Sequence, residues 1–315
     1  MDLFRRRPRH LSLPAGEQGT QETPDNLWIR CPACNEQIYE REYQDNLRVC
    51  PKCRHHFRLS LAERIETLLD AGSFEESEAD LQGTDPLKFS PEGESYADKL
   101  RKNAEKAGML EAAVSGLATI EDVPLVAVLN NFAFLGGSLG VAVGEKIVRA
   151  IEVAVARRLP LLIVSASGGA RQHEGVFGLL QMAKTTAALE RLARVEMPFI
   201  SLLTDPTIGG VPASYAMLGD VLIAEPGAYI GFAGPIVMEK AIRQKLPPGV
   251  ASSESMLAHG MIDMICSRSE LRSTIARLLR LLTGASCKRW PRGLDGVDVP
   301  TSMAATRGEG VRVDD

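Results

Sequence analysis

The chain has 315 residues, 45% of them apolar, which is enough to bury one large core and still carry a small appended module. Its 36 basic and 40 acidic residues leave a net charge of -4, so composition excludes a strongly basic nucleic-acid-binding protein and a cationic membrane-surface protein. The basic start, residues 1–7, leads into no apolar run, and no later run is long enough to span a membrane, so we expect a cytoplasmic protein without structural disulfides.

Composition divides the chain into five expected segments. The first is rich in Arg, Pro, Gly and Gln without apolar periodicity, and the last is rich in Gly, Asp and Arg, so both are predicted to be disordered. The expected segments are a basic arm at 1–27, a cysteine module at 28–58, a helical connector at 59–110, a main domain at 111–285 and a tail at 286–315. Hydrophobic spacing places a short helix in the connector, between Ser60 and about Glu78.

The main domain alternates apolar strands with amphipathic helices. Strands are predicted at 125–129, 161–164, 199–203 and 221–224. Helices are predicted around Ile147 and Ile151, at 176–194, and briefly near Tyr215. This repetition predicts an α/β architecture.

The cysteine module holds two CxxC pairs separated by 15 residues. Two such knuckles place four soft thiolates where they can close a tetrahedron around zinc. The predicted ligands are Cys31, Cys34, Cys50 and Cys53. A site closed by four thiolates leaves no position for water, so the zinc should be structural rather than catalytic. The neighbouring His55 and His56 are therefore expected to be surface residues.

The module is also locally basic, and zinc ribbons often bind nucleic acid. The basic residues are Arg41, Arg48, Lys52, Arg54, His55, His56 and Arg58. Acidic residues at Glu36, Glu40 and Glu42 are interspersed with them, which favours solvation of the ribbon or docking on a partner. A nucleic-acid-binding protein remains the alternative function.

Two glycine-rich turns, at 165–171 and 204–211, each follow a predicted buried strand and precede a helix. Backbone N–H groups in such turns can converge on an anionic ligand atom, and glycine lets that atom approach closely. Neither turn is a Walker A loop or a GxGxxG motif, which disfavours nucleotide binding. A third glycine-rich segment, at 134–140, is expected to shape the wall of the site.

The chemistry that is missing narrows the possibilities further. No GxSxG elbow supports a serine hydrolase. The pair His173 and Glu174 is a weak acid–base candidate, and an exposed polar pair is the commoner explanation for it. A domain rich in such turns and poor in nucleophiles suits the stabilisation of a thioester enolate by backbone donors.

Longer stretches of sequence carry a family resemblance. They are SASGGAR at 165–171, QMAKT at 181–185, LTDPT at 203–207, IAEP at 223–226, IGFAGP at 230–235 and GMIDM at 260–264. With the four cysteines, these stretches resemble the carboxyltransferase beta subunit of multi-subunit acetyl-CoA carboxylase, from about Trp28 to Leu282. The resemblance implies a crotonase-like (ClpP/crotonase) spiral of ββα units behind a small zinc ribbon.

The resemblance also implies a reaction. Carboxybiotin on a carrier protein would release CO2 beside acetyl-CoA, the biotin enolate would remove the methyl proton, and malonyl-CoA for fatty acid synthesis would form. Gly209 and Gly210 match the family's oxyanion-hole segment and are the implied catalytic residues. The implied substrate-binding residues are Gly168, Gly169, Ala170 and Arg171. A longer acyl-CoA is an alternative substrate. Carboxyltransferases that act on such substrates are generally of a fused type that lacks the zinc ribbon, so the four cysteines argue against it.

The implied partners are a separate alpha subunit, commonly in an α2β2 assembly, the biotin carboxyl carrier protein, and biotin carboxylase, which uses the ATP. Alone, the chain should be nearly inactive. Three positions depart from the family pattern: Gln172, Pro212 and Ile236. Pro212 removes a backbone N–H near the oxyanion turn, and Ile236 replaces an arginine that could contact a phosphate, a carboxylate or a partner.

Overall fold

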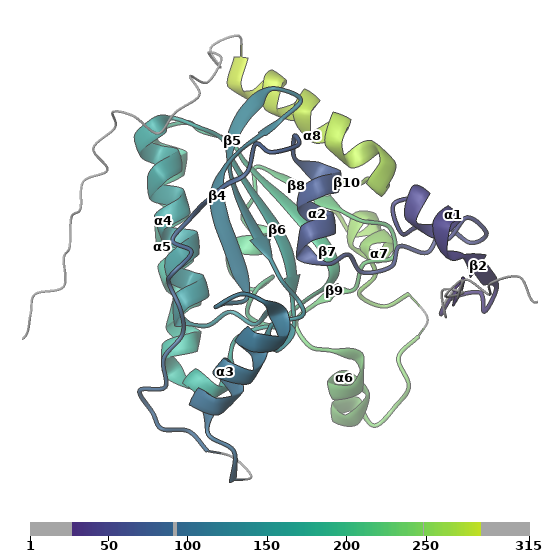
Figure 1. Cartoon of the computed structure of the whole chain (residues 1–315), viewed down its shortest axis with the longest axis horizontal. Coiled ribbons are helices and arrows are strands. Elements are labelled where there is room, and N and C mark those ends of the chain that lie inside the picture. The colour runs from purple at the N-terminus through teal and green to yellow at the C-terminus, as the bar shows by residue number, and fades with distance from the viewer. Residues whose placement is uncertain (1–26, 91–92, 248, 285–315) are drawn as a thin grey trace, which may run out of the picture.

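The structure, a computed structural model, describes residues 27–90, 93–247 and 249–284. Apart from Leu27, the predicted arm and the predicted tail lie outside this part of the chain. Figure 1 shows a central sheet with α4 and α5 on one face, α2 and α8 on the other, and the cysteine module beside the sheet. Within the described residues, no helix has the length and apolar character needed to cross a bilayer.

One sheet organises the main domain. Its strand order is β10-β8-β7-β6-β5-β4-β3, with β9 paired to β7. The strands are β3 (Glu75–Ser77), β4 (Ala113–Ile120), β5 (Val123–Asn130), β6 (Leu161–Ser167), β7 (Phe199–Ile208), β8 (Val221–Ala224), β9 (Ile230–Gly231) and β10 (Met264–Ile265). Pairing is parallel from β5 through β8 and at β9 and β10, whereas β3 and β4 are antiparallel additions.

Burial on both faces explains why the parallel strands appear in the sequence as almost continuous apolar runs. The four predicted strands are confirmed as β5, β6, β7 and β8. However, β7 continues to Ile208 rather than ending at Leu203, so the stretch Thr204–Thr207 is strand and not turn. The antiparallel strands β3 and β4 were not predicted.

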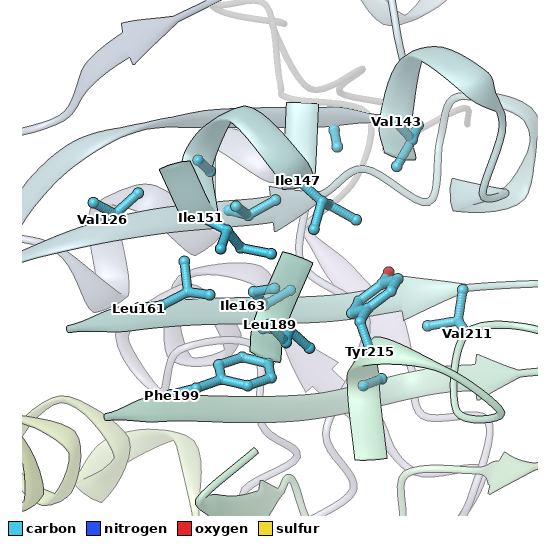
Figure 2. Close-up of a cluster of buried hydrophobic side chains, with 14 of the residues drawn as sticks. Val126, Val143, Ile147, Ile151, Leu161, Ile163, Leu189, Phe199, Val211 and Tyr215 are labelled. Atoms are coloured by element: carbon cyan, nitrogen blue, oxygen red, sulfur yellow. The ribbon is translucent and has the colours of Figure 1, made fainter. Parts of the chain in front are cut away.

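Helices cover both faces of the sheet. They are α2 (Leu61–Leu68), α3 (Tyr96–Ala107), α4 (Val141–Arg157), α5 (Val176–Arg194), α6 (Pro235–Ile242), α7 (Ser253–Ala258) and α8 (Arg268–Thr283). The bounds predicted for α5 are confirmed, and the helix near Tyr215 is a single 3-10 turn. Figure 2 shows side chains of α4 and α5, such as Ile147, Ile151 and Leu189, packed against Leu161 and Phe199 of the sheet.

The connector is part of the main fold. A capping box between Ser60 and Glu63 starts α2, which ends at Leu68 rather than near Glu78. The apolar side of α2 packs on the face of the sheet that α8 also covers, where Leu68 lies in one core cluster with Leu125 of β5 and Ile275 of α8. Since β3 then pairs with β4, the segment after the ribbon adds both a helix and a strand to the sheet domain.

The cysteine module is a small ribbon with its own core. It consists of β1 (Trp28–Arg30), β2 (Gln37–Tyr39) and α1 (Glu40–Asp45). Its strands pair antiparallel, and Ile38 and Tyr43 are buried against Cys31 and Cys50. A core this small needs additional stabilisation, which a metal ion held by the cysteines would supply.

Candidate functional site

The four cysteines converge as the spacing predicted. Their sulfur atoms all lie within 4.8 Å of one another. The Sγ atoms of Cys31 and Cys53 are 3.6 Å apart, and those of Cys34 and Cys50 are 3.8 Å apart. A tetrahedron with Zn–S bonds of about 2.3 Å has edges of about 3.8 Å, so the residues present fit a zinc ion.

The two knuckles have the same backbone geometry. Asn35 follows the second cysteine of its pair with φ of 61°, and Arg54 occupies the equivalent place with φ of 63°. The N–H groups of these residues donate to the carbonyls of Cys31 and Cys50, at 2.9 Å in each case. This symmetry points all four thiolates at one centre, and a structural zinc would hold the ribbon together there.

Replacing Cys50 with serine is expected to abolish stoichiometric zinc binding, because the tetrahedron loses a thiolate that lies in the ribbon core. Metal analysis of the purified chain measures this, and we expect one zinc per chain before the change. Cys266 provides the matched control, since it is also buried but lies outside the cluster, against Thr274. Zinc retained by Cys50→Ser, or lost by Cys266→Ser, would contradict the assignment.

His56 is not a surface residue as expected. Its side chain is buried, with Nδ1 3.1 Å from the Arg54 carbonyl and Nε2 3.3 Å from the backbone N–H of Arg268. A neutral imidazole with its proton on Nδ1 satisfies both contacts, and burial lowers the pKa of His56 in agreement. The histidine therefore joins the ribbon to α8, a role that its neighbouring cysteines obscured in the sequence.

The predicted glycine turns meet at the carboxyl ends of β6 and β7. A Cβ placed on Gly169 would lie 3.3 Å from Cα of Gly209 and 3.5 Å from the backbone nitrogen of Gly210. One placed on Gly210 would lie 3.2 Å from Cβ of Ala170. The two backbones touch, and only glycine permits that distance.

Three backbone donors at this junction have no hydrogen-bond acceptor within the described part of the chain. They are the N–H groups of Ala170, Gly210 and the fully buried Val211, whereas those of Gly168, Gly169 and Gly209 are all bonded. Free N–H groups from two adjoining turns are the donors that an oxyanion requires. The residues implied by the resemblance are thus brought together.

The third glycine segment packs against the first turn as expected. The Gly168 N–H donates to the Gly136 carbonyl at 2.8 Å, and the Leu139 N–H donates to Gly169 at 2.8 Å. A Cβ on Gly137 would lie 2.0 Å from the Ala166 carbonyl oxygen. The segment therefore forms the wall behind the first turn.

Arg171 has its side chain inside the protein and not on a ligand surface. The guanidinium is 1% exposed and forms a bidentate pair with Glu111, at 2.6 and 3.0 Å. It also donates to the carbonyl and hydroxyl oxygens of Ser138, at 2.8 and 3.0 Å. The side chain thus ties the first glycine turn to the third glycine segment.

Glu174 is also buried, so the expectation of an exposed polar pair with His173 was wrong for this residue. Its carboxylate accepts the hydroxyl proton of Tyr96 at 2.6 Å and the backbone N–H of Val141 at 2.5 Å. Burial raises the pKa of Tyr96, which keeps the hydroxyl a donor. His173 stacks on the Tyr96 ring, with centroids 5.0 Å apart. Glu174 therefore supports the turn and is not a free base.

Sequence reasoning missed Glu111 and Tyr96, which complete this support. The available signal for Glu111 was a carboxylate placed immediately before the small-residue strand Ala113–Ile120. An acid in such a position requires a cation, and Arg171 is that cation. Tyr96 carried no comparable signal, because its partners lie 75 and 78 residues away in the sequence.

The departures from the family pattern lie in different surroundings. Pro212 is half-buried directly after the second turn, and Gln172 is exposed. Ile236 is 68% exposed in the first turn of α6.

Comparison with known proteins shows the family of this chain. Residues 54–265 match the family model described as "Carboxyl transferase domain", and residues 28–53 match "Acetyl-CoA carboxylase zinc finger domain". The "Acetyl-coenzyme A carboxylase carboxyl transferase subunit beta" of Herpetosiphon aurantiacus is 51% identical over 89% of this chain and 93% of its own length. The protein of the same description from Bartonella grahamii is 47% identical over 92% and 94%.

Solved structures show the same fold. Transcarboxylase 12S, with methylmalonyl-coenzyme A and methylmalonic acid bound, superposes with a TM-score of 0.59 at 26% identity, over 71% of this chain and 41% of that chain. The Pseudomonas malonate decarboxylase MdcD-MdcE hetero-dimer gives 0.55 at 24%, over 71% and 86%. The fold is thus the α/β, crotonase-like carboxyltransferase fold with a four-cysteine zinc ribbon. The chain belongs to the family of carboxyltransferase beta subunits of acetyl-CoA carboxylase.

Proposed function

We propose that the chain binds acetyl-CoA at the junction of its two glycine turns and supplies the oxyanion hole for its carboxylation to malonyl-CoA. The observation that carries this proposal is the pair of free N–H groups on Ala170 and Gly210, held together by backbone contact between the turns. Donors fixed in place before reaction stabilise a developing enolate more than water does. Gly209 positions the second donor, because its own N–H is bonded to Gly231 at 3.0 Å.

Carboxybiotin, carried on the biotin carboxyl carrier protein, supplies the carboxyl group when it reaches this site. The residues of this chain hold the thioester oxygen and lower the energy of its enolate. Glu174 is fully engaged with Tyr96 and Val141, which supports a mechanism without a base from this chain. ATP is used by the partner biotin carboxylase and not by this chain. Zinc is the metal ion that the four cysteines of this chain would bind. We expect the chain to act in the cytoplasm.

Exposed apolar side chains around the junction support a partner subunit. They are Val176, Phe177, Leu179 and Leu180 on α5, and Phe232, Ile236, Val237 and Ile242 on or beside α6. None of the residues of α6 is buried in this chain alone, and the Phe232 carbonyl lies 3.8 Å from a Cβ built on Gly209. An apolar face that borders the site is best explained by the alpha subunit covering it.

Replacing Ile236 with aspartate is expected to weaken association with the alpha subunit by at least about tenfold, because a charge is then buried in an apolar interface. Aspartate in the first turn of α6 is compatible with the helix, so the chain itself should fold normally. Leu281→Asp on α8 is the control, since Leu281 is 73% exposed on another element. Equal association constants for the two variants, measured by calorimetry, would place the interface elsewhere.

Malonyl-CoA formation by the chain together with an alpha subunit tests the reaction, and a parallel assay with propionyl-CoA tests the alternative substrate. The nucleic-acid alternative receives no specific support. Arg48 is paired with Glu63, Arg58 is paired with Asp205, and His56 is buried, so the basic side of the ribbon is partly used within the chain.

A further inference from the structure

Besides His56, a buried arginine fastens the ribbon to the sheet domain. Arg268 begins α8, and its guanidinium donates to two carbonyls of the ribbon, Leu47 at 2.7 Å and Phe57 at 2.8 Å. The same guanidinium forms a bidentate pair with Glu225, at 2.8 and 3.0 Å. Arg268 and Glu225 are 4% and 3% exposed. A single side chain thus bridges the two parts of the protein.

Glu225 anchors this contact on the carboxyl edge of the sheet. It follows β8 directly, and its N–H donates to the Leu203 carbonyl of β7 at 3.1 Å. Burial alone would raise the pKa of Glu225, but the Arg64 and Arg268 guanidinium groups outweigh it and hold that pKa far below its usual range. The carboxylate therefore stays charged. If the arginines that face it moved away, the carboxylate would be left buried without a partner, which is strongly destabilising.

A second contact joins the ribbon side of the protein to β7, the strand that leads into the second glycine turn. Arg58, in the segment that leaves the ribbon, pairs with Asp205 at 3.1 Å and lies over the Phe132 ring at 4.5 Å. The other carboxylate oxygen of Asp205 accepts the N–H of Tyr229 at 3.2 Å. The carbonyl of Tyr229 in turn accepts the N–H of Thr207 at 2.9 Å. Thr207 lies on β7, four residues after Leu203 and two before Gly209.

The two parts pack closely on the side that faces β7. The segment from His56 to Arg64 faces the ends of β5, β6 and β7 across a cavity of about 20 Å³, lined by Asn130, Thr204 and Asp205 among others, which holds roughly one water molecule. A wider cavity of about 840 Å³ lies between the ribbon and the start of α8, so the close packing is confined to the side of Arg58.

We propose that the zinc ribbon is a positioning element for the carboxyltransferase site, acting through Arg268 and Arg58 on the end of β7, rather than a separately acting module. The inference rests on the proposed function and adds to it a reason why this carboxyltransferase subunit carries a zinc ribbon. A zinc ion bound by the four cysteines would stabilise the ribbon that carries the carbonyls of Leu47 and Phe57. Arg268 fastens these carbonyls to Glu225, and Arg58 pairs with Asp205 beside the strand that leads to the second glycine turn.

The test uses Arg58→Gln, its conservative counterpart Arg58→Lys, and Arg268→Gln, each as the full chain. Arg280→Gln is the matched control, because Arg280 lies on α8 in an exposed pair with Glu121. Three quantities are measured: zinc per chain, hydrogen exchange of the amides in 204–211, and kcat and KM for acetyl-CoA with the alpha subunit present. The exchange measurement needs no partner and no activity.

For Arg58→Gln we expect one zinc per chain, faster exchange at 204–211 and a kcat reduced by roughly tenfold, since small misplacements of reacting groups are costly. Arg58→Lys should restore most of the loss through its charge, and Arg280→Gln should match the wild type. Unchanged exchange and kcat in Arg58→Gln would overturn the proposal, even if Arg268→Gln fails to fold. A wild-type pair that makes no malonyl-CoA would refute the proposed function alone, since exchange still decides the coupling.

Discussion

Replacing Gly209 with alanine is expected to lower kcat for malonyl-CoA formation by about 10²-fold, equivalent to about 3 kcal/mol of transition-state stabilisation. Gly209 has φ of 70°, and a Cβ on it would lie 3.0 Å from Cα of Gly169. The obstacle is backbone and not a flexible side chain, so the two turns must move apart. That movement separates the N–H groups of Ala170 and Gly210, on which the oxyanion hole depends.

Gly72→Ala is the control for this change. Gly72 also has φ of 70°, but nothing lies within 4 Å of a Cβ built there, and the residue is exposed between α2 and β3. Both variants introduce the same backbone strain, so a difference in kcat reports the contact between the turns. Equal activity of the two variants, measured with the alpha subunit present, would remove the oxyanion hole from this junction.

Replacing Arg171 with methionine is expected to reduce the free energy of unfolding by about 3–5 kcal/mol. The substitution leaves the carboxylate of Glu111, which is 0% exposed, without its cation, and leaves the Ser138 oxygens without their donor. An unpaired buried charge is among the largest single costs in protein stability. Urea unfolding of the chain measures the change.

Two further variants decide what Arg171 does. Arg194→Met breaks an exposed pair with Glu190 and should leave the unfolding midpoint nearly unchanged. The double variant Arg171→Met with Glu111→Leu should recover part of the loss, because an apolar pair replaces a broken ionic one. If Arg171 instead contacted the substrate, as the family resemblance implies, Arg171→Met would unfold like the wild type and show a raised KM for acetyl-CoA.

The strands β5 to β8 of the parallel sheet and the helices α4 and α5 on one of its faces were predicted, since their apolar periodicity is strong, whereas α3 and α8 were not predicted. The antiparallel strand β4 was not predicted either, because small and hydroxyl residues interrupt its aliphatic ones and it contains Gly116. A Cβ on Gly116 would lie 2.1 Å from the Glu75 carbonyl oxygen, so this glycine is what admits β3 beside β4. Glycine within a strand normally weakens the prediction, and the pairing that explains it is long-range.

In the site, too, the features that depend on local sequence patterns were predicted, and those that depend on distant residues were not. Cysteine spacing located the four-cysteine cluster, and two glycine turns after neighbouring strands located the place where these turns meet, because both patterns are local. The roles of Arg171, His56 and Arg268 depend on partners 33 to 221 residues away in the sequence. Local pattern shows that such residues are polar, but only the fold shows that they are buried and what they hold.

Assaying malonyl-CoA formation from acetyl-CoA and a carboxybiotin donor, with and without a co-expressed alpha subunit, tests the central claim most directly. The account predicts activity from the zinc-loaded pair, and almost none from this chain alone, because the apolar face beside the oxyanion junction is then uncovered. An assembled, zinc-loaded pair that makes no malonyl-CoA would contradict the account, and Pro212 and Ile236 would be the first positions to revert to the family pattern.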